Sequence, residues 1–188
     1  MKSTSCFVLG LVFLAATASA QAPAAGQKTS LSQGLKRSYD GIKANLNDAA
    51  VKMADADYSY TPSPEIRTYA GQLGHVAFWN YFFCAAAKGE PNPNKEELEK
   101  TKTTKADVVR ALADSFTYCD PVVASLTDES AVQLVKLGQN EVARGSMLAS
   151  MIAHNNEEYG ITTVYMRMKK MVPPSTERER AQRGRGGR

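Results

Sequence analysis

MLASMIAHNNEEYGITTVY, residues 147–165, is a long run with helical periodicity that carries one of the two histidines of this 188-residue chain. Its apolar residues recur at steps of three and four, as on the inward face of a helix. His154 falls on that face, and Glu158 lies four residues further on, where it stacks over His154. A histidine and a carboxylate that point inward together are either a satisfied polar pair or part of a metal site.

Three earlier segments show the same helical period. Helices are predicted from Ser30 to about residue 53, from about residue 65 to Lys88, from Lys105 to Leu126, and from about Asn140 to Lys170. Ser30 is a good N-cap, Gly89 ends the second helix, and two prolines at residues 173–174 end the fourth. Residues 127–130 indicate a turn, and residues 131–139 are ambiguous. No segment has a convincing period of two, so the predicted class is all-α.

The connection at residues 89–103 is long enough to set the topology. About 15 residues can return along a helix and begin the next helix in parallel with it. Four long helices with one such connection predict a four-helix bundle whose second and third helices run the same way.

The first 20 residues have the features of a secretory signal peptide. Lys2 is followed by an apolar run over residues 7–16 and by Ala18-Ser19-Ala20, a small-residue cleavage pattern. We expect cleavage near Ala20 and an exported, periplasmic or secreted protein. Residues 21–29 are expected to be a linker, and no second apolar stretch of the mature chain is long enough to span a membrane.

Export changes the interpretation of Cys84 and Cys119, the two cysteines of the mature chain. An oxidising compartment permits a disulfide between them. In parallel second and third helices the two residues fall at similar heights, whereas in antiparallel helices they would lie far apart. The alternative is a pair of buried free thiols.

Charge is concentrated at the C-terminal end. The formal net charge is +4, and residues 177–188 contain five arginines against two glutamates. Without this tail and Lys2 the body is neutral, so the basic balance indicates no basic groove and no nucleic acid partner is expected. The stretch 176–188 is predicted to be a disordered, solvated tail. The sequence contains no nucleotide-binding loop, serine nucleophile motif or paired catalytic cysteines.

Several motifs together resemble the DinB-like (damage-inducible) superfamily. YSYTPSPEIRT at residues 58–68 resembles the connection before the second helix, and GHVAFWN at 74–80 resembles the first metal-histidine motif. HNNEEYG at 154–160, followed by YMR at 165–167 and VPPS at 172–175, resembles the last helix. The resemblance extends from about residue 31 to residue 175, so the bundle domain is expected at residues 30–175.

The resemblance implies an up-down-down-up bundle with a metal site between the second and fourth helices. In the family one histidine comes from the second helix, here His75, and an H-x-x-x-H pair comes from the fourth. Members bind divalent ions such as zinc, nickel or iron and often form dimers, so a homodimer is a further expectation. Some related members are thiol-dependent transferases or isomerases.

The chain departs from this pattern at one ligand position, where Glu158 stands in place of the third histidine. Two imidazoles and one carboxylate are used by catalytic zinc sites and by non-haem iron sites. The substitution therefore either shifts the metal preference toward harder ions or marks a degenerate site. Glu157 is the alternative carboxylate, and Glu158 is favoured because it holds the family position.

Two functional hypotheses follow. The first is an exported, metal-dependent transferase or hydrolase with His75, His154 and Glu158 as ligands; the second is a non-catalytic bundle with a degenerate site that acts in stress response or protein interaction. Asn80 and Tyr159 are candidates for supporting the ligands. Large apolar residues near the site are expected to belong to the core rather than to line a substrate-binding pocket; they are Trp79, Phe82, Phe83, Met147 and Met151.

Overall fold

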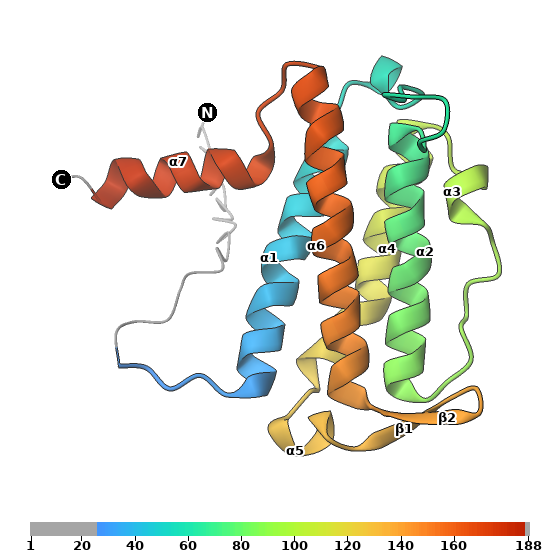
Figure 1. Cartoon of the computed structure of the whole chain (residues 1–188), viewed down its shortest axis with the longest axis vertical. Coiled ribbons are helices and arrows are strands. Elements are labelled where there is room, and N and C mark those ends of the chain that lie inside the picture. The colour runs from blue at the N-terminus through green and yellow to red at the C-terminus, as the bar shows by residue number, and fades with distance from the viewer. Residues whose placement is uncertain (1–25, 187–188) are drawn as a thin grey trace, which may run out of the picture.

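Four long helices form the body of the protein, which a computed structural model describes over residues 26–186. They are α1 (Leu31–Lys52), α2 (Tyr69–Lys88), α4 (Lys105–Ala124) and α6 (Arg144–Met168). Figure 1 shows α1 and α6 running upward in the view, whereas α2 and α4 run downward. The predicted four-helix bundle is therefore confirmed, with the up-down-down-up order. The predicted signal peptide and most of the predicted linker lie outside the described residues.

Side-chain caps determine where the helices begin. Ser30 and Gln33 form a capping box at the start of α1. The side chain of Thr68 accepts a hydrogen bond from the backbone of α2, so this helix begins at Tyr69 and not near Glu65 as predicted. Gly89 ends α2 with a left-handed φ of 71°, a conformation that glycine adopts without a steric penalty.

A small hairpin precedes α6 and corrects two predictions. The predicted turn at 127–130 begins the short helix α5 (Asp128–Ala131), and the ambiguous segment contains strand β1 (Leu134–Leu137). β1 pairs antiparallel with β2 (Asn140–Ala143), so the predicted start of the fourth helix at Asn140 was wrong. Gly138, with a φ of 61°, permits the two-residue turn between the strands. Four-residue strands with little alternation gave too weak a period to detect.

The connection between α2 and α4 runs back along the outside of α2 and carries the short helix α3 (Leu98–Thr101) (Figure 1). Two glycines of α2, Gly71 and Gly74, face this connection. A Cβ atom on Gly74 would lie 2.7 Å from the carbonyl oxygen of Leu98 and 2.8 Å from the Cα of Glu99. Glycine therefore lets the crossover approach the helix backbone more closely than any other residue would allow.

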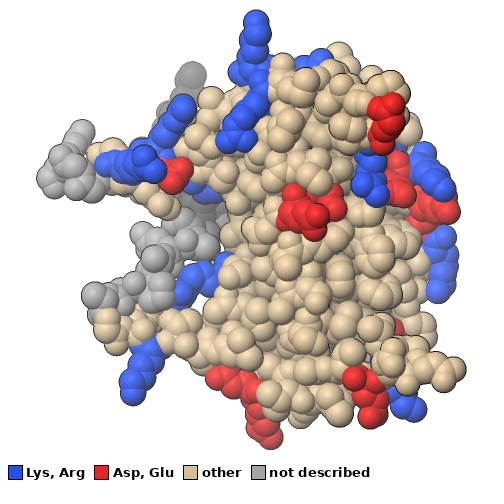
Figure 2. All heavy atoms as spheres, viewed as in Figure 1, with Lys and Arg blue, Asp and Glu red and all other residues tan. Residues whose placement is uncertain are grey.

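The C-terminal segment is a helix, and the prediction of a disordered tail was wrong for the described residues. Helix α7 (Pro174–Gly186) projects from the bundle beside α1, and Figure 2 shows basic side chains along it. Lys52 of α1 pairs with Glu177, and Asp48 of α1 pairs with Arg178 at 2.5 Å. Composition alone does not reveal such ion pairs, because their partners lie more than 120 residues away in the chain.

The core lies between the four long helices and contains several tyrosines. Tyr58 and Tyr69 donate hydrogen bonds to the carbonyl oxygens of Ala50 and Ala49, so their buried hydroxyl groups are satisfied. Other fully buried side chains of the core are Leu46, Met53, Leu73, Leu112, Phe116, Leu148 and Met151. Within residues 26–186, none of the helices has the combination of length and apolar character needed to span a membrane.

Cys84 of α2 and Cys119 of α4 form a disulfide with their Cα atoms 5.5 Å apart. Both residues are fully buried, and Met151 of α6 packs its sulfur against them. The bridge therefore joins the two parallel helices at the height that the sequence predicted.

The disulfide should contribute measurably to stability. Because it links residues 35 positions apart, reduction is expected to lower the free energy of unfolding by about 3–4 kcal/mol. Urea unfolding with and without dithiothreitol measures this difference. The Cys84→Ala/Cys119→Ala double variant is the control, since its unfolding should not respond to the reductant. Two free thiols in the unreduced protein, detected by alkylation and mass spectrometry, would contradict the bridge.

Candidate metal centre

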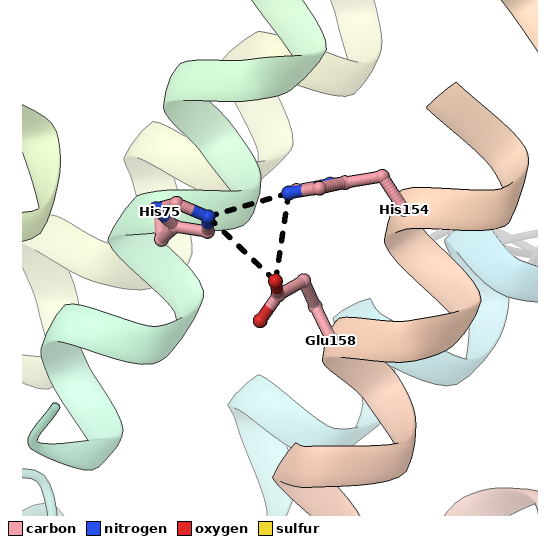
Figure 3. A group of neighbouring side chains, drawn as sticks. All are labelled: His75, His154 and Glu158. Carbon is pink, nitrogen blue, oxygen red and sulfur yellow. Dashed lines mark hydrogen bonds and ion pairs between the residues drawn. The ribbon is translucent and has the colours of Figure 1, made fainter. Parts of the chain in front are cut away.

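Three side chains from two helices converge between α2 and α6: His75 from α2, and His154 and Glu158 from α6 (Figure 3). The Nε2 atoms of the two histidines are 3.3 Å apart. Oε1 of Glu158 lies 3.6 Å from Nε2 of His75 and 3.5 Å from Nε2 of His154. The structure thus brings together all three residues that the sequence identified as metal-ligand candidates.

The geometry of α6 explains why Glu158, and not Glu157, joins the histidines. Residues four apart on a helix share one face, so Glu158 lies directly over His154. Glu158 is buried, with 6% of its surface exposed, whereas Glu157 points outward and is exposed. The preference for Glu158 at the third position is supported by this difference.

The outer nitrogen of His75 faces a carboxylate. Nδ1 of His75 lies 2.9 Å from Oε2 of Glu99 in α3. The same carboxylate oxygen accepts a hydrogen bond from Nε of Arg67, also at 2.9 Å. Partial burial alone would raise the pKa of Glu99, but the hydrogen bonds from Arg67 and His75 outweigh it and bring this pKa below its usual range. Glu99 is therefore ionised at neutral pH and acts only as an acceptor.

The outer nitrogen of His154 faces an amide at the end of a buried chain of hydrogen bonds. Nδ1 of His154 lies 3.4 Å from Oδ1 of Asn155. The Asn155 amide donates to Oδ1 of Asn80 at 2.8 Å, and the Asn80 amide donates to Ser115 at 3.1 Å. Ser115 in turn donates to the Leu112 carbonyl. Because each amide must turn its NH₂ group inward, the oxygen of Asn155 is left facing His154.

Glu158 is held by Gln72 of α2. Nε2 of Gln72 donates to Oε2 of Glu158, which leaves Oε1 directed at the two histidines. Gln72 and Asn155 are both fully or almost fully buried. Each of the three candidate ligands therefore has one outer atom bound by the protein and one inner atom turned toward the common centre.

The three inner atoms fit a small divalent cation. With separations of 3.3, 3.5 and 3.6 Å, the point equidistant from them lies about 2.0 Å from each atom, the length of a zinc–nitrogen bond of about 2.0–2.1 Å. Two neutral imidazoles and a carboxylate are ligands that zinc and iron accept. The side chains of His75 and His154 are 15% and 17% exposed, so part of each imidazole is accessible to solvent.

Aromatic side chains lie beside these two imidazoles. The ring of Trp79 lies 6.0 Å from that of His75 and 5.8 Å from that of His154, and Phe83 is also 5.8 Å from His154 between ring centroids. These rings and Phe82 are only half-buried. Phe82 and Phe83 pack against the edge of the hydrophobic core, so the expectation that they belong to the core holds for them in part, whereas Trp79 is not among the core residues. The surface over α2 and α6 carries few charged side chains in the view of Figure 2. The assignment of Met147 and Met151 to the core is confirmed, since both are buried.

The sequence identified the three candidate ligands but not the residues that bind their outer atoms, which are Gln72, Glu99 and Asn155. Of the two proposed supporting residues, Asn80 acts indirectly through Asn155, whereas Tyr159 binds Ser175 at the base of α7. Gln72 is three residues before His75 on one helix face, and this spacing was available as a signal. Glu99 lies in a connection with no periodicity, so no pattern could have placed it beside His75.

Comparisons with known proteins agree with the fold. The profile of the DinB superfamily matches residues 39–161, a span that includes all three inner residues. A DinB-like protein from Bacillus cereus is similar to this chain with a TM-score of 0.64 and 15% identity, and the alignment covers 76% of this chain and 95% of the other.

Two further solved structures have the same fold. A DinB-like protein from Bacillus subtilis has a TM-score of 0.61 and 20% identity, with 74% of this chain and 94% of the other covered. A conserved protein from Enterococcus faecalis has a TM-score of 0.60 and 15% identity, with 74% and 97% covered. No functionally curated protein matches the chain.

Burial makes the charge state of His154 depend on folding. Desolvation lowers the pKa of His154 below its ordinary value of 6.5, and this outweighs the opposing effects of Asn155 and Glu158. As the pH falls, the unfolded chain therefore binds this proton before the folded chain does. The stabilising contribution is complete above pH 6.5 and is lost as the pH decreases toward the pKa of the folded state.

An NMR titration of the imidazole resonances in the presence of a chelator tests this expectation. His154 should titrate below the value for an unfolded peptide, and the urea stability of the protein should be lower at about pH 5.5 than at about pH 7.5. His154→Gln should lose this part of the pH dependence. A folded-state pKa above 6.5 would show that burial does not govern the residue.

Proposed function

Since the chain belongs to the DinB superfamily, we propose that it binds one divalent metal ion through His75, His154 and Glu158 and acts as a metal-dependent transferase or hydrolase. The observation that carries the proposal is the orientation of the three side chains. Their inner atoms surround a centre about 2.0 Å from each, which matches zinc–nitrogen bond lengths. Their outer atoms are already bound by Glu99, Asn155 and Gln72.

The chain's own groups define what such a centre would do. His75 and His154 offer uncharged nitrogen donors, and Glu158 offers one negative charge that offsets part of the charge of the ion. A divalent ion held there supplies Lewis-acid chemistry to a bound substrate. Three protein ligands would leave coordination positions for water or substrate, and the rings of Trp79 and Phe83 lie beside His154.

The donor set favours a particular group of metals. Zinc, nickel and iron are the ions that the family resemblance implies, and all of them accept imidazole. Replacing the third imidazole by the Glu158 carboxylate makes the set harder and favours zinc or iron(II) over softer ions.

We propose further that the protein functions outside the cytoplasm. The disulfide between Cys84 and Cys119 supports an oxidising compartment, and the first 20 residues have the pattern of a signal peptide. Expression of the full chain in a bacterial host followed by N-terminal sequencing tests this. A mature protein that begins near Gln21 in the periplasmic fraction is expected, and an uncleaved protein confined to the cytoplasm would contradict export.

Metal content provides the direct test of the site. Protein purified without a histidine tag and dialysed against zinc should contain one ion per chain. His154→Ala and Glu158→Ala should lower the affinity by more than about 100-fold, since changes to supporting residues alone cost about 10–100-fold. Glu157→Ala is the matched control, because this neighbouring carboxylate is exposed and should leave the affinity unchanged.

Two outcomes would reject a functional metal site. One is wild-type protein that is fully folded and binds no zinc, nickel or iron after dialysis. The other is a sharp increase in metal occupancy on Glu158→His, which would show that Glu158 marks a degenerate site. A weak or absent site would leave the non-catalytic bundle as the better description.

A further inference from the structure

We infer that Glu99, held by Arg67, is a positioning residue that fixes the tautomer and the ring orientation of His75 for metal binding. The inference rests on the proposed function, because it concerns how one of the proposed ligands is prepared. Glu99 touches the outer nitrogen of His75 and not the centre itself. It belongs to the crossover connection, outside both helices that supply the ligands.

The hydrogen bond selects one tautomer of His75. An ionised carboxylate has no proton to donate, so the proton between Oε2 of Glu99 and the imidazole must be on Nδ1. In the neutral imidazole Nε2 then carries the lone pair, which points toward Oε1 of Glu158 and Nε2 of His154. A carboxylate bound to the outer nitrogen also makes the imidazole a stronger donor to a metal.

Arg67 holds the carboxylate of Glu99 in place. Its Nε atom donates a hydrogen bond to Oε2 of Glu99, the same oxygen that accepts the hydrogen bond from Nδ1 of His75. The backbone of Arg67 is itself fixed, because its carbonyl oxygen accepts a hydrogen bond from Tyr165 of α6 at 2.7 Å. Because Arg67 directly precedes Thr68, the N-cap of α2, it links Glu99 to both helices of the candidate metal centre.

The close approach of α3 to α2 delivers Glu99 to this position. Gly74 is the residue immediately before His75, and a Cβ atom there would lie 2.8 Å from the Cα of Glu99. Gly71 lies one turn earlier on α2. A Cβ atom at Gly71 would lie 3.3 Å from the carbonyl oxygen of Glu99. Any side chain at Gly74 would displace backbone atoms of α3, since a contact this short cannot be relieved by a rotamer change.

The first test uses the metal-free protein and so does not depend on metal binding. Ring ¹⁵N chemical shifts distinguish the Nδ1–H from the Nε2–H tautomer of His75. Wild type should show the Nδ1–H form, and Glu99→Ala should show a mixture in which Nε2–H is present. An unchanged tautomer in Glu99→Ala would overturn the inference, whatever the metal content.

The second test measures zinc affinity by competition with a chromophoric chelator. Glu99→Ala should bind zinc about 10–100-fold more weakly than wild type. Glu99→Gln retains an oxygen acceptor and should recover part of this loss. Glu97→Ala is the matched control, because Glu97 lies in the same segment and pairs only with Lys100 among the described residues.

The two proposals fail in different ways. If wild type binds no metal, the proposed function fails, and the tautomer measurement still decides the role of Glu99. If wild type binds zinc and Glu99→Ala binds it equally well, the positioning role fails and the site remains.

A purely structural role of Glu99 is distinguishable as well. It would lower the urea stability of the metal-free Glu99→Ala protein without changing the tautomer, and that result would also overturn the inference. Gly74→Ala, which displaces α3 while keeping every site side chain, should weaken zinc binding in the same direction as Glu99→Ala. Gly34→Ala is its control, because a Cβ atom there meets nothing within 4 Å.

Discussion

A carboxylate buried between two helices is the constraint on which the candidate centre depends. Among the described residues, Glu158 is the only aspartate, glutamate, lysine or arginine that is buried. A buried charge without partners is costly, and removing one partner of such a group destabilises a protein strongly. Gln72 from α2 and the imidazoles of His75 and His154 surround this carboxylate. The register of α2 against α6 must therefore place Gln72 and His75 at the height of Glu158, whether or not an ion is bound, whereas His154 is placed by its position one turn before Glu158 on α6.

The same register connects the centre to the interior. The chain of amides from Asn155 through Asn80 to Ser115 crosses from α6 to α2 and then to α4. Cys119 lies one turn after Ser115 on α4 and also contacts the Asn80 carbonyl oxygen. Polar groups buried together in this way specify one arrangement of helices, because any shift would leave an amide unpaired. The hydrogen-bond chain and the disulfide thus fix α2, α4 and α6 relative to one another beneath the candidate ligands.

Sequence reasoning recovered the parts of this arrangement that repeat with a helical period. The i, i+4 spacing of His154 and Glu158 placed both on one face, and the length of the 89–103 connection gave the parallel pair of helices. The sequence did not predict contacts that involve segments without helical periodicity. The ion pairs of α7 and the short strands before α6 belong to this class. So does Glu99, whose place beside His75 depends on a close backbone approach at Gly74.

The crossover between α2 and α4 is long for a topological reason, because two parallel helices cannot be joined by a short turn. In this protein, the same connection also carries Glu99 to the outer nitrogen of His75. The helices that supply the three candidate ligands and the segment that contacts the outer nitrogen of His75 are therefore separate parts of the chain, which approach each other closely at Gly71 and Gly74. A change in the sequence of this connection alone would therefore change the partner of the outer nitrogen of His75 while the four long helices keep the three inner side chains.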